Sequence, residues 1–107
     1  MNILFICSRN QWRSPTGEAI FKNSTQHSAR SAGTADSARV KVNERMLDWA
    51  DIIFVMEKRH KEILQSRFSI TKQVVVLDIP DEYEYMDEEL VQMITSSVSP
   101  YLQTNDA

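Results

Sequence analysis

The residues with the clearest chemical potential lie near the N-terminus, in the run Cys7-Ser8-Arg9-Asn10-Gln11-Trp12-Arg13-Ser14-Pro15. Cys7 ends an apolar stretch, and Arg13 follows it after five intervening residues. A loop that leads into a helix directs backbone N–H groups and the positive end of the helix dipole towards one point, which favours an anion. The same field stabilises a thiolate, so the sequence predicts an anion site with Cys7 as its nucleophile.

The side chains around Cys7 fit this interpretation. The planar guanidinium of Arg13 can grip two oxygens of a phosphate group, which a lysine cannot do. Ser14 can donate its hydroxyl to the sulfur of Cys7, and Asn10 tolerates left-handed backbone angles and can hold the loop by hydrogen bonds. Taken alone, Cys7 would be interpreted as a buried structural cysteine, and Ser14 as a plain helix cap before a proline at the first helical position.

Strand and helix signals alternate along the rest of the chain. The expected strands cover residues 2–6, 27–32, 51–56 and 73–77, and the expected helices cover 14–22, 43–50, 58–67 and 87–101. This order predicts an α/β fold, a single three-layer domain over residues 1–107 in which a four-stranded parallel sheet carries helices on both faces. The last residues are expected to fray.

The predicted topology brings acidic residues to the edge of the sheet that carries Cys7. Ligands of such sheets bind at the carboxyl ends of the strands. Cys7 follows the first strand, and Asp78, Asp81 and Glu82 follow the last one. A carboxyl group there could act as an acid and then as a base, although a solvated acidic loop is the more common interpretation of such a cluster.

Composition narrows the classes of partner. The 107 residues carry a net charge of −3, which argues against a nucleic acid polymer or a membrane surface as partner. A single cysteine excludes an internal disulfide and a thiolate zinc cage. We also expect no cofactor. We see no targeting leader and expect a cytoplasmic protein.

Several segments together resemble the low-molecular-weight protein tyrosine phosphatases. The most specific is Cys7 to Arg13 followed by Ser14-Pro15, which is similar to the phosphate loop of that family. Weaker similarities lie in residues 18–21, 31–34, 50–56 and 80–83. The resemblance implies that Cys7 becomes a phosphocysteine, that Arg13 binds phosphate, and that Asp81 is the general acid and base. Asp78 is the rival acid, because it lies closest to the strand end.

The resemblance also implies a set of substrate-binding residues. They are Ser8, Arg9, Asn10, Gln11, Trp12 and Ser14 of the loop, and Tyr83, which would flank the cleft as an aromatic clamp. The implied substrate is a phosphorylated protein, most of all one carrying phosphotyrosine, and the implied reaction needs no metal.

The chain departs from the family pattern at four points. It is shorter than most members, and the shortfall between Thr34 and Asp51 implies a more open cleft. Trp12 stands where many members have a second cysteine, so oxidised Cys7 would need an external thiol for its rescue. Arg9 replaces a small residue, and Glu82 replaces a proline beside Asp81.

Other residues have less specific interpretations. Trp12 could be a wall that stacks on a leaving group, or it could pack beneath the loop. Trp49 is expected in the core, and His27 and His60 are expected at the surface. The basic residues Arg39 and Lys41, and those of the segment 58–61, could lend positive charge to a substrate site, but solvated helix faces are the favoured interpretation.

Three other functions are compatible with the sequence. An open cleft with Arg9 and Trp12 at its mouth could take small phosphoesters such as nucleotides or cyclic phosphodiesters. An arsenate reductase would need an external thiol, because Cys7 is alone. A non-catalytic phosphate or phosphopeptide sensor needs only the intact loop, so the importance of Asp81 would distinguish it from an enzyme.

Overall fold

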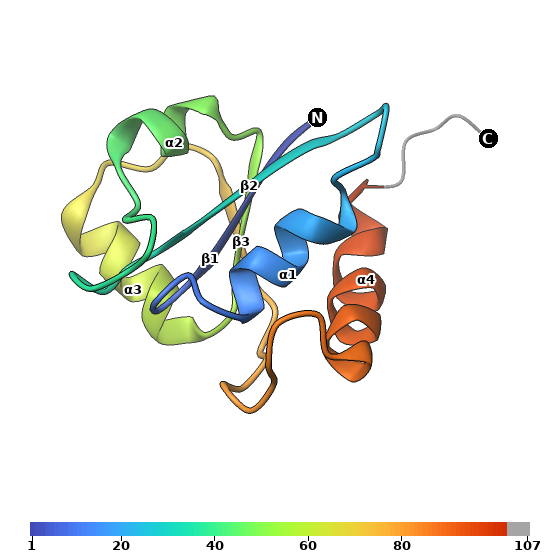
Figure 1. The fold of residues 1–107 in the computed structure, drawn as a ribbon. Helices are drawn as coiled ribbons and strands as arrows, with labels where there is room; N and C mark the ends of the chain where they lie inside the picture. Colours follow the sequence, from blue (N-terminus) through green and yellow to red (C-terminus); the bar gives the residue numbers. More distant parts are fainter. Residues whose placement is uncertain (103–107) are drawn as a thin grey trace.

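The computed structural model describes residues 1–102 and has the predicted alternation of strands and helices (Figure 1). The strands are β1 (Asn2–Cys7), β2 (Ser28–Gly33), β3 (Ile52–Val55) and β4 (Gln73–Val76). The helices are α1 (Arg13–Ile20), α2 (Glu44–Trp49), α3 (Lys58–Arg67) and α4 (Glu88–Leu102). The expectation of fraying at the end of the chain concerns residues 103–107, which lie outside the described part.

All four strands are parallel, and their order in the sheet is β2-β1-β3-β4. β1 therefore lies inside the sheet, with Cys7 beside Gly33 of β2. Its residues Ile3, Leu4, Phe5 and Ile6 are fully buried, which explains why the strand reads as one continuous apolar run. The predicted α/β class and four-stranded parallel sheet are confirmed.

Alternate residues of the inner strands face two separate cores. Ile3 and Phe5 of β1 and Phe54 of β3 pack with Leu90, Ile94 and Val98 of α4. Leu4, Ile6 and Ile53 face the other way and pack with Leu47 of α2 and Leu64 of α3. Helices α1 and α4 thus cover one face, and α2 and α3 cover the other (Figure 1).

The packing of α1 on the sheet requires Gly17. A Cβ atom at this position would lie 2.6 Å from Cγ of the Phe5 ring, which is well inside van der Waals contact. Phe5 in turn stacks on Phe21 and Phe54, with ring centroids 6.1 and 5.6 Å apart. This close approach fixes the direction in which α1 leaves the loop that follows β1.

Capping agrees with the sequence for one helix and differs for another. The side chain of Asn43 accepts a hydrogen bond from the N–H of Met46, so Asn43 caps α2 as its residue type suggests. Helix α1, however, begins at Arg13 after Trp12, so the expected cap at Ser14 is wrong. Pro15 still falls in the first turn, where an N–H has no partner within the helix.

Two aromatic side chains lie between core and surface. Trp49 is half-buried beside the α2–α3 core, and the guanidinium carbon of Arg30 lies 4.3 Å from its ring centroid. His27 is also half-buried and meets the edge of Phe21, with ring centroids 5.9 Å apart. We expected Trp49 in the core and His27 at the surface, and both expectations therefore hold only in part.

No helix within residues 1–102 is long and apolar enough to cross a membrane.

Candidate functional site

The loop between β1 and α1 is held by backbone hydrogen bonds to the segment after β2. The N–H groups of Thr34, Ala35 and Arg39 donate to the carbonyls of Cys7, Ser8 and Arg9. Asn10 has a φ of 55°, so the predicted left-handed conformation is confirmed. The path of this loop is therefore set by a second segment that lies about 25 residues away in the sequence, rather than by local turns alone.

Gly33 makes this close contact possible. A Cβ atom at Gly33 would lie 2.4 Å from the carbonyl oxygen of Ser8 and 2.9 Å from the backbone nitrogen of Asn10. Both neighbours are backbone atoms and cannot move aside as a flexible side chain could. The glycine is therefore part of the support of the loop.

A buried chain of hydrogen bonds runs from Cys7 to Glu18. Ser31 donates to the Glu18 carboxylate at 2.5 Å, and the Asn10 amide donates to both Ser31 and Ser14 at 2.9 Å. Ser14 Oγ lies 2.9 Å from Cys7 Sγ. Because Asn10 fills an acceptor site of Ser14, the Ser14 proton is available for the sulfur.

The position of Ser14 explains why it does not cap α1. Its Oγ atom faces Cys7 and lies 3.3 Å from the carbonyl oxygen of Ala32, and the residue is fully buried. The hydroxyl therefore serves the centre of the loop. The residue type alone did not distinguish these two uses, because an N-cap and a thiol partner both need a short hydroxyl.

Hydrogen bonds hold the guanidinium of Arg13 so that one edge of it faces the cleft. Only 2% of the residue is exposed, although it carries a charge. Its Nη1 atom donates to Glu57 Oε2 at 2.5 Å and to the carbonyl of Ile79 at 2.8 Å. Such anchoring fixes the plane of the fork and leaves Nε and Nη2 for an anion.

Glu57 joins two arginines at the edge of the cleft. Arg59 donates to its carboxylate from Nη2 at 3.1 Å, beside the bond from Arg13. Hydrogen bonds from Arg59 and Arg13, opposed by partial burial, lower the pKa of Glu57 to about 2. The carboxylate is therefore ionised at neutral pH and fixes both guanidinium groups. Glu57 was not among the residues predicted from the sequence. Arg59 is exposed, as expected, and also lines the cleft.

His60 is fully buried, so the expectation of a surface histidine is wrong. Its Nδ1 atom accepts the backbone N–H of Glu57 at 3.0 Å, and its Nε2 atom lies 2.9 Å from Ser8 Oγ. A neutral ring with the proton on Nε2 satisfies both contacts. Burial and the nearby Arg13 and Arg59 cations lower the pKa of His60 to about 4, which keeps the ring neutral.

These elements enclose a cleft of about 370 Å³. The residues that line it are Cys7, Ser8, Arg9, Gln11, Trp12, Arg13, Arg59 and Asp81. Three arginines and one carboxylate make the cleft locally positive, in a chain with a net charge of −3. The cleft therefore suits an anion.

The structure separates the two candidate acids. Asp81 lines the cleft, and its Oδ1 atom lies 3.6 Å from Nε of Arg13. Asp78 is exposed, has a φ of 58°, and is not among the residues that line this cleft. The turn at Asp78 carries the chain over Ile79, whose carbonyl binds Arg13, and so brings Asp81 to the cleft.

The aromatic candidates lie in different places. Trp12 is 40% exposed and lines the cleft, which favours the interpretation as a wall over packing beneath the loop. Tyr83 packs against the α1–α4 core and is not among the cleft-lining residues of the described chain. The adjacent Glu89 raises the pKa of Tyr83 to about 12.

Comparisons with known proteins agree with this geometry. A sequence profile described as "Low molecular weight phosphotyrosine protein phosphatase" matches residues 2–48. The chain is 25% identical to a protein-arginine-phosphatase of Bacillus subtilis, and the alignment covers 99% of this chain and 88% of that protein. The aligned stretch of 133 residues exceeds the length of this chain, so the relative contains additional residues.

Solved structures share the fold at low sequence identity. A low molecular weight protein tyrosine phosphatase from Streptococcus pyogenes superposes with a TM-score of 0.78 at 17% identity, covering 98% of this chain and 95% of that one. The YwlE arginine phosphatase, as a C7S mutant with a phosphorylated active-site serine, superposes with a TM-score of 0.75 at 21% identity, covering 99% of this chain and 98% of that one. Residues 2–48 thus match the low molecular weight phosphotyrosine protein phosphatase family, and the chain as a whole shares the fold of solved phosphatases of that family.

Proposed function

We propose that this protein is a cysteine-dependent phosphatase that hydrolyses phosphomonoesters through a phosphocysteine on Cys7. The observation that carries the proposal is the meeting of three groups in one cleft: Cys7 with its Ser14 partner, the fixed guanidinium of Arg13, and the Asp81 carboxyl. Each group answers one need of phosphoryl transfer, namely a nucleophile, a phosphate clamp and a proton donor.

In the first step the Cys7 thiolate attacks phosphorus, and the bond from phosphorus to the leaving oxygen breaks. Asp81 gives its proton to that oxygen, so the leaving group departs as a neutral alcohol or phenol. Nε and Nη2 of Arg13 bind the equatorial oxygens, because Nη1 is held by Glu57 and Ile79.

In the second step water attacks the phosphocysteine, and the Asp81 carboxylate takes the proton of that water. The sulfur leaves as a thiolate, and inorganic phosphate is released. The Ser14 hydroxyl stabilises the departing sulfur by a hydrogen bond. Arg13 and the N-terminus of α1 provide the positive charge, so the reaction needs no metal.

The substrate class we favour is phosphotyrosine in proteins. Trp12 offers an exposed aromatic wall at the cleft, on which a phenolic leaving group can stack. Phosphoarginine is the second candidate, because a relative that matches 99% of the chain is named a protein-arginine-phosphatase. Arg9 and Arg59 at the cleft would repel the cationic guanidinium that phosphoarginine releases, which favours the phenolic substrate.

The function is tested by turnover of p-nitrophenyl phosphate against pH, in reductant and EDTA, for the wild type and Cys7→Ser. We expect a bell-shaped profile with an acid-side optimum that disappears in Cys7→Ser. Activity equal to that of the mutant at every pH would mean that the loop binds anions without cleaving them. Phosphotyrosine and phosphoarginine peptides of the same sequence, compared by kcat/KM, then distinguish the two substrates.

The proposed mechanism needs Cys7 in its reduced form, which fits a cytoplasmic location.

A further inference from the structure

A second and larger hollow lies beside α1, outside the catalytic cleft. Its volume is about 710 Å³, which is in the range of ligand sites. The hollow is lined by residues of α1, the turn after it, β2, and two loops: Gln11, Pro15, Glu18, Ala19, Phe21, Lys22, Ser24, His27, Ser28, Ala29, Arg39 and Tyr85. The reacting groups Cys7, Arg13 and Asp81 do not line this hollow, which we call the α1 groove.

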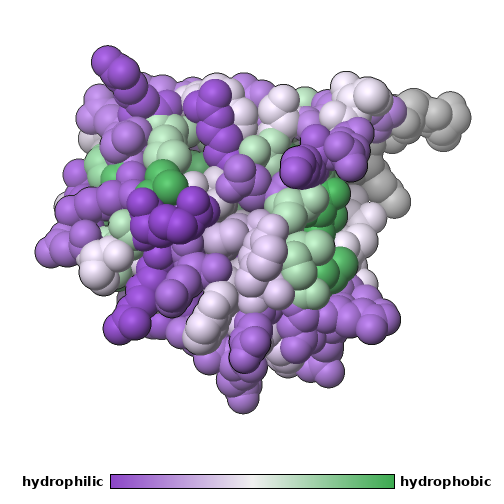
Figure 2. Space-filling view, in the orientation of Figure 1, coloured by the Kyte–Doolittle hydropathy of each residue, from purple (hydrophilic) through white to green (hydrophobic). Residues whose placement is uncertain are grey.

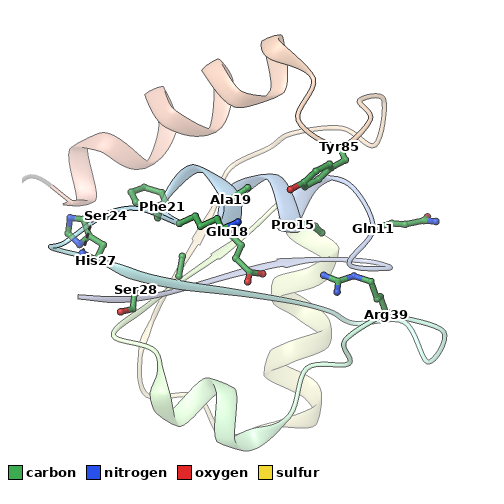
Figure 3. Close-up of a pocket in the computed structure, with 12 residues that line it drawn as sticks. Gln11, Pro15, Glu18, Ala19, Phe21, Ser24, His27, Ser28, Arg39 and Tyr85 are labelled. Carbon is green, nitrogen blue, oxygen red and sulfur yellow. Dashed lines mark hydrogen bonds between the residues drawn. The ribbon is translucent and has the colours of Figure 1, made fainter.

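The α1 groove begins where the catalytic cleft ends. Gln11 lines both cavities, so the two share a border. Figure 3 shows Gln11 and Arg39 at one end of the groove, Glu18 and Ala19 along its length, and His27 at the far end. A chain held in the cleft by its phosphate can therefore continue into the groove without crossing the rest of the protein.

The groove reaches the free edge of the sheet at Ser28 and Ala29, the first two residues of β2. β2 pairs with β1 on one side only and is the outermost strand. The backbone bonds of Gly33 to Val40 and Val42 cover only its last residue. An edge strand offers backbone N–H and C=O groups to an extended peptide. Alongside the eight residues of α1, about 12 Å of helix, such a peptide would extend over about four residues.

The charges of the groove favour an acidic peptide. Lys22 and Arg39 are exposed cations on its wall. Glu18 is the one carboxylate of the lining and accepts a hydrogen bond from Ser31, so the groove has two cationic side chains against one carboxylate. In Figure 2 the surface is largely hydrophilic, and hydrophobic colour gathers in two places, beside α1 and α4 on the right and over the region of α2 on the left. A purely apolar ligand does not fit this lining.

We propose that the α1 groove is a docking site for the substrate's own polypeptide, and that it binds about four residues of acidic, extended chain next to the phosphorylated residue. The inference rests on the proposed function, because the phosphate must sit in the catalytic cleft. It extends that function from the chemistry of the cleft to the choice among phosphoproteins.

The test compares two substrates that differ in reach. p-Nitrophenyl phosphate fills the catalytic cleft alone, whereas phosphotyrosine peptides with four glutamates before or after the phosphotyrosine also reach the groove. Lys22→Glu should lower kcat/KM for the better of the two peptides by about three- to fivefold, the range of an exposed charge pair. The rate with p-nitrophenyl phosphate should not change. Ser28→Trp narrows the groove at an exposed position, so it should also lower kcat/KM for the peptide and leave the rate with p-nitrophenyl phosphate unchanged.

Arg45→Glu is the matched control, because it makes the same charge change at an exposed position on α2, on the opposite face of the sheet. Equal effects of Lys22→Glu and Arg45→Glu on the peptide, or no effect of Lys22→Glu, would overturn the proposal. If the groove instead binds a second copy of this chain, sedimentation of the wild type should show a dimer, and Ser28→Trp should abolish that dimer. This result would also overturn the proposal.

A binding measurement separates the groove from catalysis. In the Cys7→Ser background, the same peptides are titrated and their Kd values are compared with and without Lys22→Glu. If the protein binds phosphopeptides but does not cleave them, Lys22→Glu should still raise the Kd of the acidic peptides about three- to fivefold. The groove proposal would then hold even though the proposed function had failed. If p-nitrophenyl phosphate is hydrolysed and the acidic peptides bind no better than neutral ones, the groove proposal fails alone.

Discussion

The Oγ atom of Ser14 lies 2.9 Å from the Sγ atom of Cys7, and both atoms are buried. The direction of this bond follows from its neighbours. Glu18 can only accept when ionised, so Ser31 donates to it, and Asn10 donates to Ser31 and to Ser14. Ser14 therefore keeps its own proton, and the Cys7 sulfur at 2.9 Å is a nearer acceptor for it than the Ala32 carbonyl at 3.3 Å.

Ser14→Ala removes this hydrogen bond and should reduce the fraction of Cys7 present as thiolate. We expect kcat to fall by about 10- to 100-fold, since a hydrogen bond to a charged group contributes about 1.5–3 kcal/mol. The rate of alkylation by iodoacetamide should also fall below that of the wild type. Ser96→Ala, an exposed change on α4, is the control, and an unchanged alkylation profile in Ser14→Ala would refute the role.

Glu57→Gln tests the carboxylate that holds Arg13 and Arg59. The variant should lose activity by about 10-fold or more, because the fork of Arg13 is no longer fixed by a charged partner. The pKa of Glu57 is lowered to about 2, so its stabilising contribution is full above the ordinary value of 4.5 and is lost as pH falls towards 2. The difference in Tm between wild type and variant should therefore shrink below pH 4.5. A constant difference down to pH 3 would contradict this linkage.

His60 should make the fold sensitive to mild acid. Its pKa of about 4 lies below the ordinary value of 6.5, so the unfolded chain binds more protons between these two values. Stability contributed by the neutral ring is therefore lost as pH falls through this window, by about 2 kcal/mol between pH 6.5 and pH 5. Urea unfolding of His60→Asn, which keeps an acceptor for the Glu57 N–H, should show a flatter pH dependence than the wild type. Equal slopes would show that His60 does not titrate in this way.

Gly33→Ala and Gly17→Ala form a matched pair. A methyl group at Gly33 meets the backbone of Ser8 and Asn10 at 2.4 and 2.9 Å, whereas one at Gly17 meets the Phe5 ring at 2.6 Å. Both should cost about 1–3 kcal/mol of stability through overpacking. Gly33→Ala should also displace the loop and lower kcat by more than 10-fold, while folded Gly17→Ala should keep most of its activity. Chemical denaturation and p-nitrophenyl phosphate turnover measure the two effects separately.

The sequence predicted what is contiguous in the chain. The alternation of strands and helices, the tolerance of Asn10 for left-handed angles and the cluster from Cys7 to Ser14 follow from local residue types and spacing, whereas the order of the strands in the sheet came only from the structure. The residues that were missed reach the cleft through tertiary structure. Glu57, Arg59 and His60 begin α3, which the β3 strand brings beside Arg13, and their types fit a solvated helix start equally well. The pattern Glu57 to His60 does form a capping box, and this was the one local signal that could have pointed to them.

The choice between Asp81 and Asp78 shows the same limit, and it gives the last prediction. The resemblance implied Asp81 as the acid, and Asp78 was its rival because it lies nearer to the strand end. Of the two residues, Asp81 lines the cleft and Asp78 does not. Asp81→Asn should lower kcat by about 100-fold or more, and Asp78→Asn should leave it within about twofold. The loss in Asp81→Asn should be larger for phenyl phosphate than for p-nitrophenyl phosphate, because the poorer leaving group depends more on its proton donor. Hydrolysis of the phosphocysteine should slow as well, because water activation loses its base. If Asp78→Asn were the damaging change, the acid loop would have to close differently on substrate, and the cleft described here would be an open state.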